Sequence, residues 1–220
     1  MQKFLFWCGW IVMTLIALYL SAVTLVYFSF RSDIYFLLAK QQVVDFLPWR
    51  VAFYIHITGG LVALAIGPFQ FLEKFRAKHM KLHRTLGKIY VAAILLLGGP
   101  AGFFMAFFAN GGPWADVGFM FMAFFWVLTT WLALSAIMKK DLKGHIRWMI
   151  RSYALCFSAV TLRILTPMLS LVFHIKSAYI LIAVAWVSWM INLAVAQVII
   201  YLKYNKKKAL PPKIQNLLNS

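Results

Sequence analysis

Six long apolar stretches follow one another along this chain, and shorter polar segments separate them. Each stretch is at least as long as the run of about 20 apolar residues that a helix needs to cross a hydrocarbon core. Apolar and polar positions do not alternate strictly, so the pattern favours helices over a transmembrane β-barrel. It therefore predicts an all-α integral membrane bundle with helices two to five as its core and with spans at 4–29, 51–72, 89–109, 117–138, 148–172 and 178–202.

One membrane domain accounts for most of the chain. The composition agrees, because 64% hydrophobic residues and a mean hydropathy of +0.83 leave too little polar surface for a water-soluble globule. The first apolar run is longer than the about 7 to 15 residues of a signal peptide, so we interpret it as an uncleaved anchor helix. We expect a six-helix transmembrane domain over residues 1–205 and a polar cytoplasmic tail over residues 206–220.

The basic residues are distributed unevenly between the two sides of the membrane. The net charge is +17, and when the six spans are threaded alternately, 17 of the 22 Lys and Arg residues fall on the side that holds both termini. The positive-inside rule then predicts that both termini are cytoplasmic. We interpret the basic loops as orientation signals that also contact anionic lipid headgroups, and not as a nucleic-acid-binding surface.

Two ionisable side chains, His56 and Arg163, lie inside predicted spans in the external half of the membrane. Such groups are costly in lipid and normally face the bundle interior. Gly60 and Gly67 follow His56 on one helical face, which suits the close approach of a second helix or of a flat ligand such as a porphyrin or a quinone. His56, Gly60 and Arg163 thus predict a site for a small flat or anionic ligand. Ordinary helix packing and an arginine satisfied by broken helix ends stay open as alternatives.

A second candidate site lies on the cytoplasmic side. His83 is followed by Gly87 at the same four-residue offset that separates His56 from Gly60, and His145 lies on the same side of the membrane. Neutral imidazoles are axial ligands of haem iron, and a glycine one turn away leaves room for the macrocycle. We therefore expect His83 and His145 as candidate ligands of the iron of a haem b, with headgroup contact as the alternative. His174 is the candidate that would complete an axial pair with His56.

Three segments together resemble the signature of a known family: "HITGGLVALAIGPFQF" at 56–71, "HRTLGKIY" at 83–90 and "HIRWMIRSYALCFSAVTLRI" at 145–164. In this order and spacing they are similar to a bacterial membrane-protein family known as domain of unknown function 2306, over residues 50–165. The resemblance implies a multi-pass protein of the bacterial inner membrane. It also implies that the following residues occupy the family's motif positions: His56, Gln70, His83, Arg84, Gly87, His145, Arg151 and Arg163.

A looser resemblance is to the six-helix transmembrane b-type cytochromes and ferric reductases. It rests on the helix count and on the two His-x-x-x-Gly pairs. Those families bury two histidines per haem in helices two to five, whereas here only His56 is plainly inside a span and the fourth span has no histidine. The comparison thus favours a single haem, or a quinone at His56 and Arg163, over electron transfer through two haems.

We therefore expect a redox-related membrane protein that binds haem or quinone within the helix bundle. Two other classes stay open: a small transporter of an anionic solute, for which Pro68, Pro100 and Pro167 would supply helix breaks, and an assembly or scaffold protein without cofactor. Paired carboxylates, Ser-His-Asp and metal-rich constellations are lacking among the five acidic residues, which argues against a soluble-type hydrolase. The sequence does not determine the oligomeric state.

Overall fold

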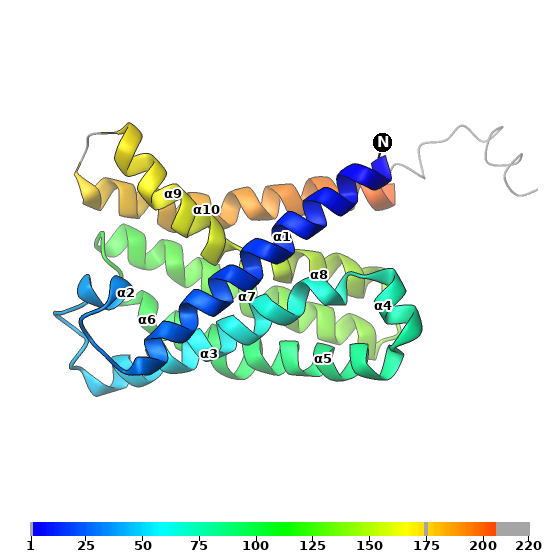
Figure 1. The fold of residues 1–220 in the computed structure, drawn as a ribbon, viewed down its shortest axis with the longest axis horizontal. Coiled ribbons are helices and arrows are strands. Elements are labelled where there is room, and N and C mark those ends of the chain that lie inside the picture. Colours follow the sequence, from blue (N-terminus) through cyan, green and yellow to red (C-terminus); the bar gives the residue numbers. More distant parts are fainter. Residues whose placement is uncertain (1, 174–175, 206–220) are drawn as a thin grey trace, which may run out of the picture.

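The computed structural model describes residues 2–173 and 176–205, with side chains over 7–173 and 176–203. These residues form a bundle of helices that contains no β-strand (Figure 1). The prediction of an all-α membrane bundle is confirmed, since six helical segments are long and apolar enough to cross a membrane. These segments are Trp7–Ser29, Leu47–Gln70, Met80–Ala106, Pro113–Met138, Leu142–Val172 and Ser177–Lys203. The predicted tail at 206–220 lies outside the described residues.

Several spans are built from more than one helical element. The elements are α1 (Gln2–Thr24) with the 3-10 turn η1 (Leu25–Ser29), α3 (Leu47–Gln70), α5 (Met80–Ala92) with the π-helical η2 (Ala93–Gly98) and α6 (Gly99–Ala106), α7 (Pro113–Met138), α8 (Leu142–Cys156) with α9 (Ser158–Val172), and α10 (Ser177–Ile200) with the π-helical η3 (Tyr201–Asn205). Two short helices, α2 (Tyr35–Leu38) and α4 (Glu73–Lys78), lie between spans.

The third and fifth spans begin earlier than the hydropathy pattern predicts. The helices start at Met80 and Leu142, whereas the predicted apolar runs start at residues 89 and 148. Hydropathy marks only the apolar part of a helix, and here the helical backbone continues through the basic residues that precede it. As a consequence, His83 and His145 lie on the first turns of two long helices and not in loops.

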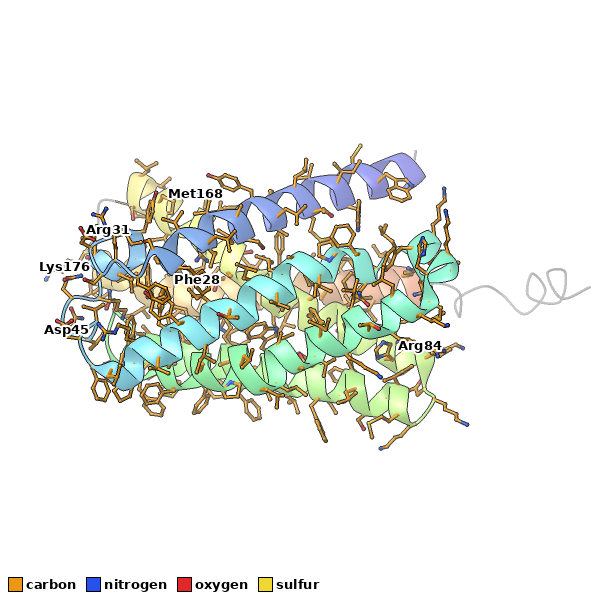
Figure 2. The ribbon with its side chains drawn as sticks, turned by 60° about the horizontal axis from the view of Figure 1, so that its bottom comes forward. Phe28, Arg31, Asp45, Arg84, Met168 and Lys176 are labelled. Atoms are coloured by element: carbon orange, nitrogen blue, oxygen red, sulfur yellow. The ribbon has the colours of Figure 1, made fainter. Side chains whose placement is uncertain are left out.

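The two ends of the bundle differ in chemistry. The N-terminus and α4 lie at the same end in Figure 1, and there Lys203 of η3 pairs with Glu73 of α4 at 3.7 Å. We call this end, formed by α4, the turn at 139–141 and η3, the basic end. The opposite end, formed by residues 30–46 and 107–112, is called the long-loop end. Figure 2 shows Arg84 at the basic end and Arg31 and Asp45 at the long-loop end.

Two of the three prolines do not interrupt helices as the sequence suggested. Pro68 lies inside α3 and Pro167 lies inside α9, and the fifth span instead bends at Phe157, between α8 and α9. Proline has no backbone N–H, so Pro68 leaves the Leu64 carbonyl without its helical donor. Tyr153 Oη of α8 donates to that carbonyl at 3.2 Å. A side chain of a neighbouring span therefore restores the hydrogen bond that the proline removes.

A buried lysine ties the long-loop end together. Lys40 is 3% exposed, and its ammonium donates to the Phe108 carbonyl and, at 2.7 Å, to Asn110 Oδ1. The amide of Asn110 donates back to the Ala39 carbonyl at 2.9 Å, so the 30–46 loop is attached to the turn before α7. Burial lowers the pKa of Lys40 to about 8, and the Asp116 carboxylate opposes this shift.

Lys40 makes the stability of the fold depend on pH in a defined window. The folded chain releases the Lys40 proton near pH 8, whereas the unfolded chain keeps it to about pH 10.5, so stability rises with pH between these values. The slope is about 1 kcal/mol per pH unit at most. We expect the melting temperature of the detergent-solubilised protein to rise between pH 8 and pH 10, relative to a Lys40→Met variant measured alongside. Parallel curves for the two proteins would contradict the assignment.

Candidate functional site

The closest approach between spans brings α3 against the π-helical segment η2. A Cβ atom at Gly59 would lie 2.5 Å from both the Ala93 carbonyl oxygen and the Gly98 nitrogen, so only glycine fits there. The π-helical turn lies immediately before Pro100, at the junction of α5 and α6. Our sequence analysis missed Gly59 and Gly98. The adjacent glycines at 59 and 60 and at 98 and 99 were the signal for backbone contact.

This contact fixes His56. Its Nδ1 lies 2.8 Å from the Gly98 carbonyl oxygen, and because a carbonyl only accepts, Nδ1 is the donor; in the neutral ring Nε2 then keeps its lone pair. The imidazole packs on Gly102, where a Cβ would lie 2.7 Å from Nδ1. The edge of the Trp126 ring faces it, with 6.4 Å between ring centroids. None of the described residues donates a hydrogen bond to Nε2, which is therefore an acceptor inside the membrane span.

Arg163 lies on α9 beyond the bend of the fifth span. Its Nη1 donates to the Ala159 carbonyl of its own helix at 3.0 Å, and the side chain is exposed. Arg163 lies nine residues from the end of α9 at Val172, and His56 lies nine residues from the start of α3 at Leu47, so both are about 13 Å from the long-loop end. The two side chains therefore lie at a similar depth in the membrane, His56 on α3 and Arg163 on α9.

The surroundings of Arg163 contain no acidic partner from the described part of the chain. The ion pairs of the described chain, Arg31 with Asp33 and Lys203 with Glu73, lie elsewhere. Arg163 interacts electrostatically with Tyr27 of η1, whose hydroxyl oxygen accepts from the Phe36 amide at 3.2 Å. Arg163 is thus a membrane-level cation that leaves most of its donors for a ligand or for lipid.

The small-residue face that follows His56 has two different functions. At Gly60 a Cβ atom would meet nothing within 4 Å, so the surface beside His56 is open. Further along α3, Ala63 is fully buried and Gly67 lies against the ring of Tyr153. Only the first turn of this face is therefore free for a ligand, and the remainder is helix packing.

The adjacent glycines Gly59 and Gly60 differ sharply in the space available to them. We expect Gly59→Ala to lower the melting temperature of the purified protein by several degrees or to prevent its accumulation, because the added methyl overlaps η2. Gly60→Ala, the matched control, has room and improves helix propensity by up to about 1 kcal/mol. Equal melting temperatures for the two variants would show that α3 and η2 are not in contact.

The second candidate site lies at the basic end. His145 Nδ1 lies 2.8 Å from the Ala133 carbonyl of α7, so this imidazole also presents an unprotonated Nε2. His83 Nδ1 is buried and has no hydrogen-bond partner among the described residues. The two imidazoles interact electrostatically. Both histidines therefore lie at the basic end, on the first turns of α5 and α8, and their pairing at a haem stays a prediction. His174, the other predicted axial candidate, lies outside the described residues.

The space beside Gly87 is taken by Gln70. The Gln70 Oε1 atom lies 3.5 Å from the position of a Cβ at Gly87, and the side chain is only 6% exposed. Its Nε2 is buried, and no described residue accepts a hydrogen bond from it. A buried amide without an acceptor is costly, so it indicates a group that the protein chain alone does not supply.

A chain of hydroxyl groups lies deeper in the same half of the bundle. Tyr90 Oη is 2.9 Å from Ser152 Oγ, which is 2.7 Å from Thr130 Oγ1, and Thr130 is 2.7 Å from the Trp126 carbonyl. The carbonyl must accept, which gives every bond one direction, from Tyr90 towards Trp126. All three hydroxyl residues are fully buried. Our sequence analysis did not identify this chain, although Tyr90 and Ser152 each follow a site histidine by seven residues.

Arg151 has a different environment from Arg163. Its Nη2 donates to Gln197 Oε1 at 2.8 Å, and its guanidinium lies 4.6 Å from the Trp148 ring centroid. These groups line a largely apolar cavity of about 440 Å³ between α7, α8 and α10. Arg151 therefore fastens helices together. Among the described residues, no three potential metal-ligating side chains gather at one place.

The fold and its polar interior define a class: a six-span membrane protein with two histidine-containing sites, one inside the membrane and one at the basic end. The chain belongs to the family described as "Predicted membrane protein (DUF2306)", which matches residues 53–200. This match confirms the resemblance seen in the three sequence segments. No curated protein and no solved structure matches the chain.

Proposed function

We propose that the protein binds an isoprenoid quinone or quinol within the membrane, at a site formed by His56 and Arg163. The observations that carry the proposal are an exposed arginine at the membrane depth of His56 and the hydrogen bond from His56 Nδ1 to the Gly98 carbonyl, which leaves Nε2 free. Ionisable groups at this depth are costly and mark functional sites. A redox-related function follows from this choice of ligand.

The two groups complement the headgroup of a quinone. Arg163 has several N–H donors for a quinone oxygen, and the free Nε2 of His56 accepts the hydroxyl proton of the reduced form. The open surface at Gly60 lies one turn from His56 and leaves room for a flat ring. Because Arg163 is exposed within the span, a ligand with a long apolar tail can reach the site sideways from the lipid. A small anionic solute would match Arg163 but would gain nothing from an imidazole that accepts.

Two substitutions test the site directly. His56→Asn keeps an N–H donor near the position of Nδ1 but removes Nε2, and Arg163→Met keeps an unbranched side chain of similar length without the charge. Loss of a hydrogen bond to a charged group costs about 1.5–3 kcal/mol, so we expect Arg163→Met to bind a short-chain menaquinone or ubiquinone analogue about 10- to 100-fold more weakly in calorimetric titrations. We expect His56→Asn to weaken binding of the reduced quinol form, because only the quinol has a hydroxyl that donates to Nε2.

Arg151→Met is the matched control, because Arg151 lies in the same span but has its own partners. It should bind the analogue with wild-type affinity. Wild-type protein that binds no quinone, and releases none on solvent extraction after purification, would overturn the proposal. Binding of a small organic anion in its place would favour the transporter, and no ligand of either kind would favour the scaffold.

Haem b between His83 and His145 is a second candidate function. It is favoured by the neighbourhood of the two imidazoles and by the free Nε2 of His145. We expect, for this candidate, a sharp reduced α-band in protein purified from cells supplied with a haem precursor, and its loss in His83→Ala and His145→Ala. His56→Asn should leave the band unchanged. A featureless spectrum at full haem supply would exclude this candidate and leave the quinone site untouched.

The orientation and location of the protein form part of the proposal. Most of the Lys and Arg residues that the structure describes belong to the end of the bundle that holds α4 and the N-terminus, which by the positive-inside rule faces the cytoplasm. The likeness to bacterial membrane proteins supports the bacterial inner membrane as the location. At this face the basic residues would contact anionic lipid headgroups.

A further inference from the structure

Two buried polar atoms at the basic end have no partner in the described chain: Nδ1 of His83 and Nε2 of Gln70. His83 lies on α5, and Gln70 lies against the same helix, because Gly87, one turn beyond His83, faces Gln70. Inside a protein, buried polar groups are almost always hydrogen-bonded, and where the chain supplies no partner, ordered water does. Two such atoms on neighbouring turns therefore indicate more than one water molecule.

The order of polar residues along α5 and α8 continues this polar region towards the middle of the bundle. Both helices begin at the basic end, and each carries a histidine followed by a hydroxyl residue seven positions later: His83 and Tyr90 on α5, His145 and Ser152 on α8. The histidines interact with each other, and the hydroxyls are joined at 2.9 Å. The histidines form one polar layer between α5 and α8, and the hydroxyl residues form a second layer closer to the centre.

The distance between these layers matches the length of a short file of water. Seven residues of helix span about 10 Å, which corresponds to roughly two or three water molecules at hydrogen-bond spacing. Gln70 lies between the two layers, with a free Nε2 that can donate to such a water. Tyr90 donates its own proton to Ser152, so its oxygen is left to accept from the innermost water.

We propose that ordered water fills the gap from His83 past Gln70 to Tyr90 and gives the hydroxyl chain of Tyr90, Ser152 and Thr130 proton contact with the basic end. The ligand is water, and the function is proton exchange between that surface and the centre of the bundle. Each hydroxyl gives its proton to a neighbour and takes one back along the same file, so protons exchange and no group changes its net charge. The inlet does not require a quinone or a haem to be bound.

Hydroxyl-radical labelling tests the water directly, since radicals formed from bound water modify adjacent tyrosines. Tyr153 is the matched control, because it is also buried, but its hydroxyl is occupied by the Leu64 carbonyl. In wild-type protein we expect Tyr90 to be labelled several-fold faster than Tyr153. Gln70→Leu should lower the Tyr90 rate to that of Tyr153. Equal, slow labelling of both tyrosines in wild-type protein would overturn the proposal, whether or not the variant folds.

Proton contact is tested by isotope exchange at Ser152. A Ser152→Cys substitution in a Cys8→Ser background introduces an S–H group whose infrared band is resolved from the rest of the protein, and the band of native Cys156 is subtracted with the background protein. In deuterated buffer the new S–H should exchange at least tenfold faster than in the same protein carrying Gln70→Leu. An exchange rate that Gln70→Leu does not change would show that no water reaches the chain along this route.

Discussion

The arrangement of this bundle depends on one constraint: a backbone carbonyl in a dry bilayer must find a donor within the protein. The π-helical turn and the prolines disturb the regular helical pattern, and side chains of neighbouring spans supply donors at or near those points. Tyr153 donates to Leu64, and His56 donates to Gly98. These bonds also have a chemical consequence, because donation from Nδ1 fixes the tautomer of His56, and His145 is fixed in the same way by Ala133. Nε2 is left as an acceptor in both histidines.

Trp126 of α7 lies between His56 and the buried hydroxyl chain. The carbonyl of Trp126 ends the hydroxyl chain that begins at Tyr90, while its indole ring faces the imidazole of His56. The polar groups of the bundle therefore follow one route, from the basic end to a site about 13 Å below the long-loop end. A membrane protein that bound a quinone at one end of this route would have water-derived protons available close to it.

Residues of one type behave differently in this protein according to their neighbours. Arg151 and Arg163 belong to the same span, yet the first is held by Gln197 and Trp148, and the second meets no acidic or amide partner among the described residues. The family resemblance puts both arginines in motif positions and does not distinguish them. Twelve residues, about 18 Å of helix, separate them, and the span is interrupted between them at Phe157.

The sequence alone was sufficient for the class of fold and the number of spans, because apolar run length is a property of each segment by itself. It misplaced the starts of two spans, since hydropathy does not register a helix that continues through basic residues. Which groups meet was decided only by the tertiary structure. Gly59 and Gly60 are identical in sequence terms, but the rotation of α3 turns one against η2 and leaves the other open. The tautomers of the histidines, the partner of Arg151 and the unpaired amide of Gln70 likewise follow from how six helices tilt and rotate against one another, which no single segment encodes.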